Sequence, residues 1–302
     1  MTRFIVLALL AAVAPVPQTT FRSSVEVVEL DVTVMRGGVP VGGLTASDFA
    51  LTDIGVAQEV QSVTLDQLPL SVTLVLDISR SVAGNRLQHL VQAGEGLTTA
   101  LRPDDRAALI TFSHSVDLRV PMTGDMRMIR DALGAMAGSG ATSLRDAVQL
   151  ALELQPHDRS RPLLLVFSDG DDTESWLTDD AAIDSARHGG VVIHAVRAAS
   201  DSSLDRATWT GVGGSTWPAS DSFLDRLTQT AGGRAWSATS DRQLQELFTR
   251  ALDEMRARYL LTYTPRGVGQ PGWHELKVKL KTGSADVTAR RGYFVAAASP
   301  PR

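Results

Sequence analysis

The distribution of apolar and polar positions divides the chain into three stretches. Between residues 70 and 256, short runs of aliphatic and β-branched residues alternate with longer segments whose apolar residues recur at helical spacing. The flanking stretches, 18–69 and 257–297, contain only short strand-like runs separated by turn residues. We therefore expect a central α/β domain with β structure on either side of it in the sequence.

The central stretch predicts a doubly wound, mostly parallel sheet, because each strand is followed by a helix. Expected strands are 70–76, 106–112, 163–167, 191–196 and 234–237, and expected helices are 86–101, 125–136, 143–154, 178–188, 221–230 and 241–255. The run 116–121 follows its neighbouring strand after a brief loop, so it is predicted as an antiparallel edge strand. The Ser/Gly/Trp-rich segment Ser200–Ser220 is predicted as a long surface loop.

The flanking stretches predict one small β-sandwich-like module. Strand-like runs occupy residues 25–35, 49–52 and 58–65 before the central domain, and 259–264, 273–281 and 285–295 after it. Each set is too small to build a core alone, and the ends of a domain are often close together. The predicted organisation is an N-terminal β module (18–69), a central domain (70–256) and a C-terminal β segment (257–297) that packs with the N-terminal module.

The first 17 residues have the pattern of a signal peptide. Arg3 gives a positive start, Phe4–Val13 is an apolar run of ten residues, and Ala11, Ala12 and Ala14 supply small residues near a plausible cleavage site. The alternative is a buried N-terminal strand. The signal-peptide interpretation predicts a periplasmic or secreted protein, and no later segment has the length and apolarity for stable membrane insertion once the signal is removed.

Composition excludes several classes of function. The 302 residues contain no cysteine, which excludes disulfides, thiolate metal sites and cysteine nucleophiles. Net charge is −5, and no run of Lys and Arg interleaved with aromatic residues is present, so nucleic-acid binding is not indicated. The six histidines are scattered without metal-ligand spacing.

Oxygen-bearing side chains follow two of the predicted strands and begin one predicted helix. Asp77, Ser79 and Ser81 alternate after the strand 70–76, so they point to one side of an extended chain. Thr142 precedes the helix 143–154, and Asp169 follows the strand 163–167. The carboxyl ends of parallel strands meet at one sheet edge, where ligands bind in such folds. Because hard cations prefer oxygen ligands, these five residues predict a Mg²⁺ site, with Mn²⁺ or Ca²⁺ as alternatives.

These motifs resemble the metal-ion-dependent adhesion site of von Willebrand factor A domains: Asp-x-Ser-x-Ser at residues 77–81, then Thr142, then Ser-Asp-Gly at residues 168–170. The segments Gly43–Phe49 and Arg290–Tyr293 are similar to those of a bacterial group of related proteins. The resemblance implies that the two serines and the threonine coordinate Mg²⁺, that the two aspartates act largely through water, and that an Asp or Glu carboxylate of a protein partner completes the coordination.

The expected function is therefore metal-dependent, adhesion-type protein binding and not catalysis. One alternative is a phosphatase-like hydrolase with Asp77 as nucleophile, although such sites usually carry a second aspartate where this chain has Ser79. Another is a structural module with an empty metal site that binds through Trp209 and Trp217 of the long loop.

Further polar residues surround the predicted site in the sequence. Asp171, Asp172 and Glu174 are expected to form a solvated turn, with tuning of the metal site as the alternative. Asp146 is expected to order the Thr142 loop or to cap the helix that follows it.

Overall fold

The computed structural model describes residues 27–65, 68–156, 158–169, 171–198, 222–238 and 240–296. The predicted signal peptide (1–17) and the whole of the predicted loop Ser200–Ser220, with Trp209 and Trp217, lie outside the described residues. No helix within these ranges is long and apolar enough to cross a membrane.

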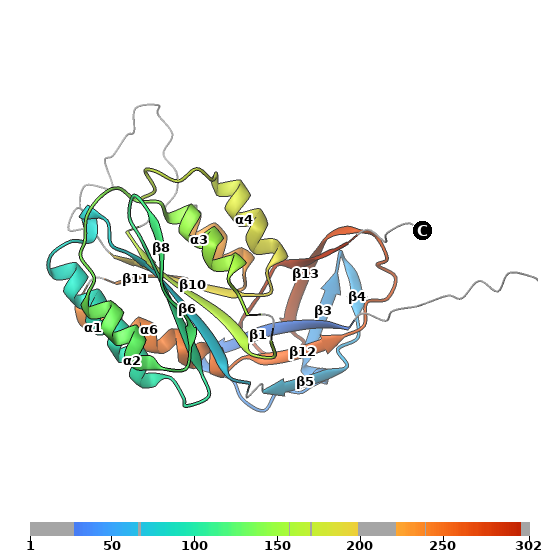
Figure 1. Ribbon diagram of the computed structural model, residues 1–302. Helices are drawn as coiled ribbons and strands as arrows, with labels where there is room; N and C mark the ends of the chain where they lie inside the picture. The colour runs from blue at the N-terminus through green and yellow to red at the C-terminus, as the bar shows by residue number, and fades with distance from the viewer. Residues whose placement is uncertain are drawn as a thin grey trace, which may run out of the picture.

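The larger part of the protein is built on a six-stranded sheet (Figure 1). Its strand order is β11-β10-β9-β6-β7-β8, in which only the edge strand β8 runs antiparallel to its neighbour. The strands are β6 (Leu70–Asp77), β7 (Arg106–Phe112), β8 (Val116–Thr123), β9 (Arg161–Ser168), β10 (Val192–Ala198) and β11 (Ala235–Ala238). All eight residues of β6 are buried, as expected for a central strand covered on both faces.

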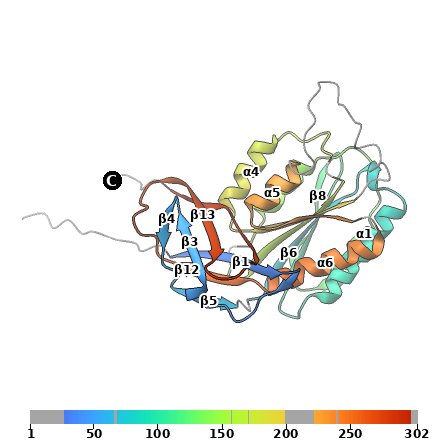
Figure 2. The same cartoon turned by 180° about the vertical axis from the view of Figure 1, so that it is seen from behind.

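Helices cover both faces of this sheet (Figures 1 and 2). One face is covered by α1 (Asn85–Ala100), α2 (Met126–Gly134) and α6 (Asp241–Arg256), and the other by α3 (Leu144–Glu153), α4 (Asp179–His188) and α5 (Phe223–Thr230). Alternate residues of β6 serve the two cores: Leu74 packs with the first set of helices and Val75 with the second. The α/β class and the antiparallel edge strand predicted from the sequence are confirmed.

The flanking stretches form two further sheets around a shared core that includes Leu30, Phe49 and Leu261. One contains β14 (Asp286–Ala289), β1 (Val28–Arg36), β12 (Tyr259–Tyr263), β5 (Ser62–Leu65) and β2 (Val39–Pro40). The other contains β15 (Gly292–Val295), β13 (Gly272–Leu280), β3 (Phe49–Asp53) and β4 (Val56–Gln58). β1 pairs with β12 and β3 pairs with β13, so each of these two sheets contains strands from before and after the larger part of the chain. We call this part the β module.

Two predicted strands were wrong in their extent. The run 58–65 is divided between β4 and β5, and the run 285–295 is divided between β14 and β15. In both cases the two pieces belong to different sheets, so the chain changes sheet within each run. Two short one-turn 3₁₀ helices, η1 (Ala46–Asp48) and η2 (Arg80–Val82), complete the described elements.

Two chain segments join the β module to the larger part, and one carboxylate holds both. Asp105 is 2% exposed, and its Oδ1 accepts a hydrogen bond of 2.8 Å from the backbone N–H of Leu70, where the first segment enters β6. Its Oδ2 accepts a hydrogen bond of 2.9 Å from Nη2 of Arg256, at the end of α6, where the second segment leaves the larger part of the protein. A buried carboxylate with an arginine partner and backbone donors fixes the spacing of the two segments.

Candidate metal centre

Asp77 is the last residue of β6 and is fully buried. Its Oδ1 accepts a hydrogen bond of 2.8 Å from the backbone N–H of Ser79, and its Oδ2 accepts 2.8 Å from the hydroxyl of Ser168. Ser168 ends the neighbouring strand β9, directly before Asp169. The two carboxylate oxygens are therefore held from the carboxyl ends of two adjacent parallel strands, β6 and β9.

The loop that carries Thr142 is attached to the same edge by its backbone. Ser139 donates to the carbonyl oxygen of Ile78 at 2.8 Å, and Arg80 donates to that of Gly140 at 3.1 Å. Gly140 has φ +90°, and a Cβ there would lie 2.5 Å from Nδ1 of His114, so a side chain at this position meets both backbone strain and a clash. The loop consequently lies against the Asp-x-Ser-x-Ser segment, as predicted.

The hydroxyls at this edge are arranged as a cation site requires. The Oγ atoms of Ser79 and Ser81 are 3.0 Å apart, so two neutral oxygens point to the same region. Thr142 is 6% exposed, and no hydrogen bond of its hydroxyl is found among the described residues. Within the described ranges no cluster of three or more His, Cys, Asp or Glu side chains suits a metal, so any ion bound here would depend on hydroxyl oxygens.

The electrostatic surroundings of Asp77 disfavour its ionised form. Burial, together with the nearby charge of Asp169, raises the pKa of Asp77 to about 6, while hydrogen bonds from Ser79 and Ser168 act in the opposite direction. A cation at this edge would stabilise the Asp77 carboxylate in its ionised form. The donor set of two aspartates, two serines and a threonine thus fits a hard divalent cation.

Comparison with known proteins agrees with this geometry. Residues 72–171 match the family model of the von Willebrand factor type A domain. This chain contains a von Willebrand factor type A domain. Within the A domain lie Asp77, Ser79, Ser81, Thr142 and Asp169, all five residues of the candidate metal centre.

Curated relatives match only part of the chain. An uncharacterized protein of Synechocystis, sll0103, is 29% identical over 89 residues, which are 29% of this chain and 21% of that protein. The mouse inter-alpha-trypsin inhibitor heavy chain H2 is 28% identical over 131 residues, covering 37% of this chain and 13% of the relative. The chain therefore spans about a fifth or less of the length of these relatives.

Solved structures share the fold. A von Willebrand factor type A protein from Catenulispora acidiphila is similar with a TM-score of 0.50 and 13% identity, over 85% of this chain and 75% of that one. Proximal thread matrix protein 1 from the mussel byssus, with a zinc-occupied metal-ion-dependent adhesion site, gives a TM-score of 0.50 and 16% identity, over 67% of this chain and 49% of that one.

The rim of the A-domain site is more ordered than the expected solvated turn. Asp172 caps helix α3 from another loop: its Oδ2 accepts 2.9 Å from the backbone N–H of Arg145 and 2.6 Å from the hydroxyl of Ser175. Asp146 accepts hydrogen bonds from the backbone of Trp176 at 3.0 Å and Leu177 at 3.1 Å. The solvated-turn expectation is thus wrong for Asp172, which is partly buried, whereas Asp171 and Glu174 are exposed. Asp146 holds the backbone at residues 176 and 177, and among the described residues no hydrogen bond joins its carboxylate to its own helix or to the Thr142 loop.

Trp176 is a surface residue of this rim that the sequence interpretation missed. It is 95% exposed, although it lies in a segment whose backbone is fixed by Asp146. The same loop donates two backbone hydrogen bonds, from Thr173 and Glu174, to the carbonyl oxygen of Thr142. The signal in the sequence was a single tryptophan within an otherwise acidic, polar segment. A polar segment of this kind supplies few apolar neighbours, so an exposed tryptophan could have been predicted there.

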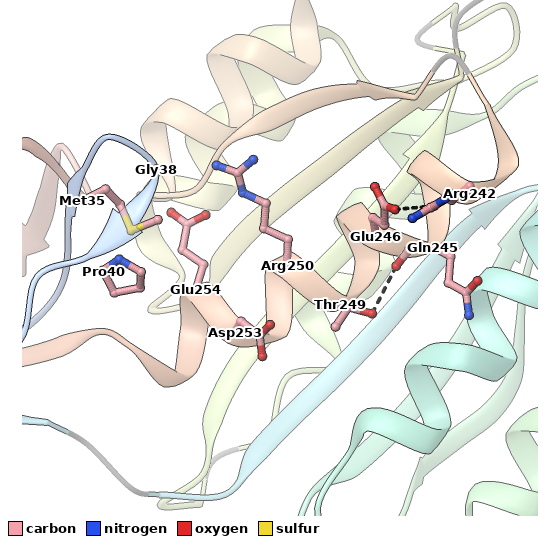
Figure 3. Close-up of a pocket in the computed structure, with 10 residues that line it drawn as sticks. All are labelled: Met35, Gly38, Pro40, Arg242, Gln245, Glu246, Thr249, Arg250, Asp253 and Glu254. Atoms are coloured by element: carbon pink, nitrogen blue, oxygen red, sulfur yellow. Dashed lines mark hydrogen bonds and ion pairs between the residues drawn. The ribbon is translucent and has the colours of Figure 1, made fainter.

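A groove away from the metal centre has a different character (Figure 3). It lies between the β1–β2 hairpin, which contributes Met35 and Pro40, and one side of helix α6, and its volume is about 680 Å³. The charged side chains that line it on α6 are of both signs, and one pair, Arg242 and Glu246, is joined at 2.8 Å. None of the groove's lining residues belongs to the metal centre.

Proposed function

We propose that this protein is an exported binding protein whose A domain holds Mg²⁺ and presents it to a carboxylate of a protein partner. The observation that carries the proposal is that three separate chain segments meet at the end of β6. Ser79 and Ser168 donate to the buried carboxylate of Asp77, and the Thr142 loop is hydrogen-bonded to the backbone just after it. In this proposal Ser79, Ser81 and Thr142 bind the ion directly, while Asp77 and Asp169 act largely through water. The bound ion supplies a positive charge with few direct anionic ligands, which favours one further carboxylate.

Two features support binding in preference to phosphoester hydrolysis. Both oxygens of Asp77 already accept hydrogen bonds, from Ser79 and Ser168, which leaves that carboxylate poorly placed to act as a nucleophile. Position 79 carries a serine, so the second aspartate that would act as acid and base is replaced by a neutral hydroxyl. The zinc-occupied adhesion site of the mussel protein supports a divalent cation at the equivalent kind of site.

Calorimetric titration of Mg²⁺ into the EDTA-treated full chain tests the metal. We expect binding in the wild type, loss of at least about tenfold in affinity in Asp77→Ala, and wild-type affinity in Asp104→Ala, because Asp104 is exposed and lies at the opposite end of the sheet. Mn²⁺, Ca²⁺ and Zn²⁺ titrated in parallel rank the ions. Absence of Mg²⁺ heat in the wild type, or equal heats in the two variants, would contradict the proposal.

We also propose that Trp176 contributes to the partner surface beside the ion. Large aromatic side chains dominate protein interfaces, and one held on an ordered backbone loses little entropy on binding. The flanking Asp171 and Glu174 are exposed carboxylates, so they disfavour an acidic partner until a cation offsets their charge. The partner surface would then combine an acidic group for the ion with an apolar pocket for the indole.

Immobilised peptides with a central Asp, Glu, Asn or Gln test the partner chemistry. Retention of the full chain should require Mg²⁺ and an acidic peptide, and should be abolished by EDTA. Trp176→Ala should weaken retention about tenfold or more while leaving Mg²⁺ affinity unchanged, whereas Trp236→Phe, on the other side of the domain under Arg250, should leave retention unchanged. Equal retention on Asp and Asn peptides would refute the carboxylate.

Export and the domain organisation complete the proposal. Residues 1–17 act as a signal peptide, and residues 18–69 and 257–297 together form a sandwich-like module that orients the A domain in the periplasm or outside the cell. N-terminal sequencing of the protein recovered from the envelope and medium of an expressing bacterium tests this. A protein that stays in the cytoplasm with residues 1–17 intact would contradict it.

A further inference from the structure

A cavity of about 990 Å³ lies where the β module meets the A domain, at the sheet edge opposite the metal centre. The A domain contributes Arg161 and Val192, which begin the parallel strands β9 and β10. The β module contributes residues of β1, β12 and β15, including Leu260 and Phe294. The cavity is therefore formed jointly by the two parts of the protein and shares no residue with the metal centre.

Arg258 lines this cavity and has too few hydrogen-bond acceptors for its charge. The residue is fully buried, and its Nη2 donates 2.7 Å to the carbonyl oxygen of Gly232. Its Nε and Nη1 atoms have no hydrogen-bond partner, and no ion pair within 4.0 Å involves this residue in the described part of the chain. A buried guanidinium with most of its donors unpaired is costly unless another group supplies the acceptors.

The cavity has a second arginine with free hydrogen-bonding capacity. Arg290 donates 3.0 Å from Nη2 to the carbonyl oxygen of Glu29, and its Nε has no partner among the described residues. Two of the three acidic residues in the lining are already engaged, because Asp31 pairs with Arg161 at 2.5 Å and Asp158 pairs with Arg106. The lining includes five arginines and three acidic residues, so the cavity carries an excess of positive charge.

We propose that this cavity binds a small oxyanion, a carboxylate or phosphate, through Arg258 and Arg290. The planar guanidinium fork matches two oxygens of such an anion, and the pairing is strongest in a partly desolvated site. Burial lowers the pKa of Arg258 to about 10, even though the charges of Asp31 and Glu254 act in the opposite direction. The apolar lining from Leu260, Val192 and Phe294 leaves room for the carbon skeleton of an organic anion.

Thermal unfolding of the full chain in EDTA, with sodium phosphate, citrate or acetate against sodium chloride at equal ionic strength, tests the site. We expect at least one oxyanion to raise Tm above the chloride value in the wild type and equally in Asp77→Ala, which separates this site from the metal centre. Calorimetry with the stabilising anion should show at least about tenfold weaker binding in Arg258→Met and in Arg290→Gln. The control Arg250→Gln, in the groove of Figure 3, should bind as the wild type does.

The two variants keep the test decisive. Arg290 is only partly buried, so Arg290→Gln should fold even where Arg258→Met does not. Comparing the Tm in phosphate with the Tm in citrate and acetate shows whether the site prefers a tetrahedral or a planar oxyanion. The proposal is overturned if none of the oxyanions exceeds chloride, or if the effect persists unchanged in Arg290→Gln and in every folded Arg258 variant.

Discussion

Replacing Asp53 should destabilise the β module more than any other single polar substitution in it. Asp53 ends β3 and is fully buried. Its Oδ2 accepts hydrogen bonds from the hydroxyls of Tyr263 at 2.9 Å and Tyr293 at 2.8 Å, and its Oδ1 lies 2.8 Å from Nδ1 of His274. The other ring nitrogen of His274 lies 2.7 Å from the carbonyl oxygen of Gln270. Asp53 therefore joins two tyrosines and one histidine of the β module in a single hydrogen-bond network.

The magnitude follows from the groups left behind. Asp53→Ala removes the acceptor of three buried or partly buried donors, each costing about 1–3 kcal/mol when unsatisfied. The three penalties overlap, so we expect the free energy of unfolding to fall by about 3–5 kcal/mol, a large fraction of the stability of many domains. Tyr293→Phe leaves the carboxylate with its other two partners and should cost only about 1 kcal/mol.

Urea unfolding monitored by tryptophan fluorescence measures both variants, because Trp273 lies in strand β13 of the β module. Asp286→Ala provides the matched control: this aspartate lies on β14 of the same module but is exposed, so its removal should change stability by less than about 0.5 kcal/mol. An Asp53→Ala loss below about 1 kcal/mol, or one no larger than that of Tyr293→Phe, would show that the network does not hold the module together.

Two further predictions concern the metal-site loop and alkaline stability. Gly140→Ala should cost about 1–3 kcal/mol and weaken Mg²⁺ binding, because a Cβ there meets His114 at 2.5 Å and φ is +90°; Gly134→Ala, with open space around it, should do neither in the same melts and titrations. Stability should fall above about pH 10, because unfolded tyrosines lose their protons there while burial keeps the pKa of Tyr263 above its ordinary value and raises that of Tyr293 to about 12. For two phenols, the free energy of unfolding falls by at most about 2.7 kcal/mol per pH unit. Urea melts from pH 9 to 11 should show a weaker dependence on pH in the Tyr263→Phe/Tyr293→Phe double variant. An unchanged dependence would contradict the prediction.

The sequence was sufficient to predict those strands and helices whose whole length follows a single residue pattern. Strand β6 is a run of Leu, Val, Ser and Thr that ends in Asp77, and both its extent and its polar end could be inferred from that pattern. The division of 58–65 between two sheets could not, because neither Gly nor Pro interrupts the run at residues 59–61. Nothing local distinguishes a strand that continues from one that crosses to the opposite sheet; the choice depends on pairing with distant strands such as β12.

Residues of the candidate site could be predicted where they belong to a local sequence motif. Residues that act as long-range hydrogen-bond partners could not. Asp77 and Ser79 belong to an alternating motif that the eye can find, whereas Ser168 is one hydroxyl at a strand end whose bond to Asp77 spans 91 residues. Asp172 was assigned to solvent because it lies in an acidic run, but its carboxylate reaches the N-terminus of α3 across the fold. Long-range capping of this kind leaves no local pattern in the sequence.

The shared carboxylate of Asp105 has a mechanical consequence. The chain enters the A domain at Leu70 and leaves it at Arg256, and both points are tied to this one side chain, at the sheet edge opposite the metal centre. A partner that pulls on the ion would load the strands along their length and transmit tension to the β module through two adjacent segments. Tension along strand axes must shear many hydrogen bonds at once, so the A domain should resist pulling from its metal edge better than pulling across the sheet.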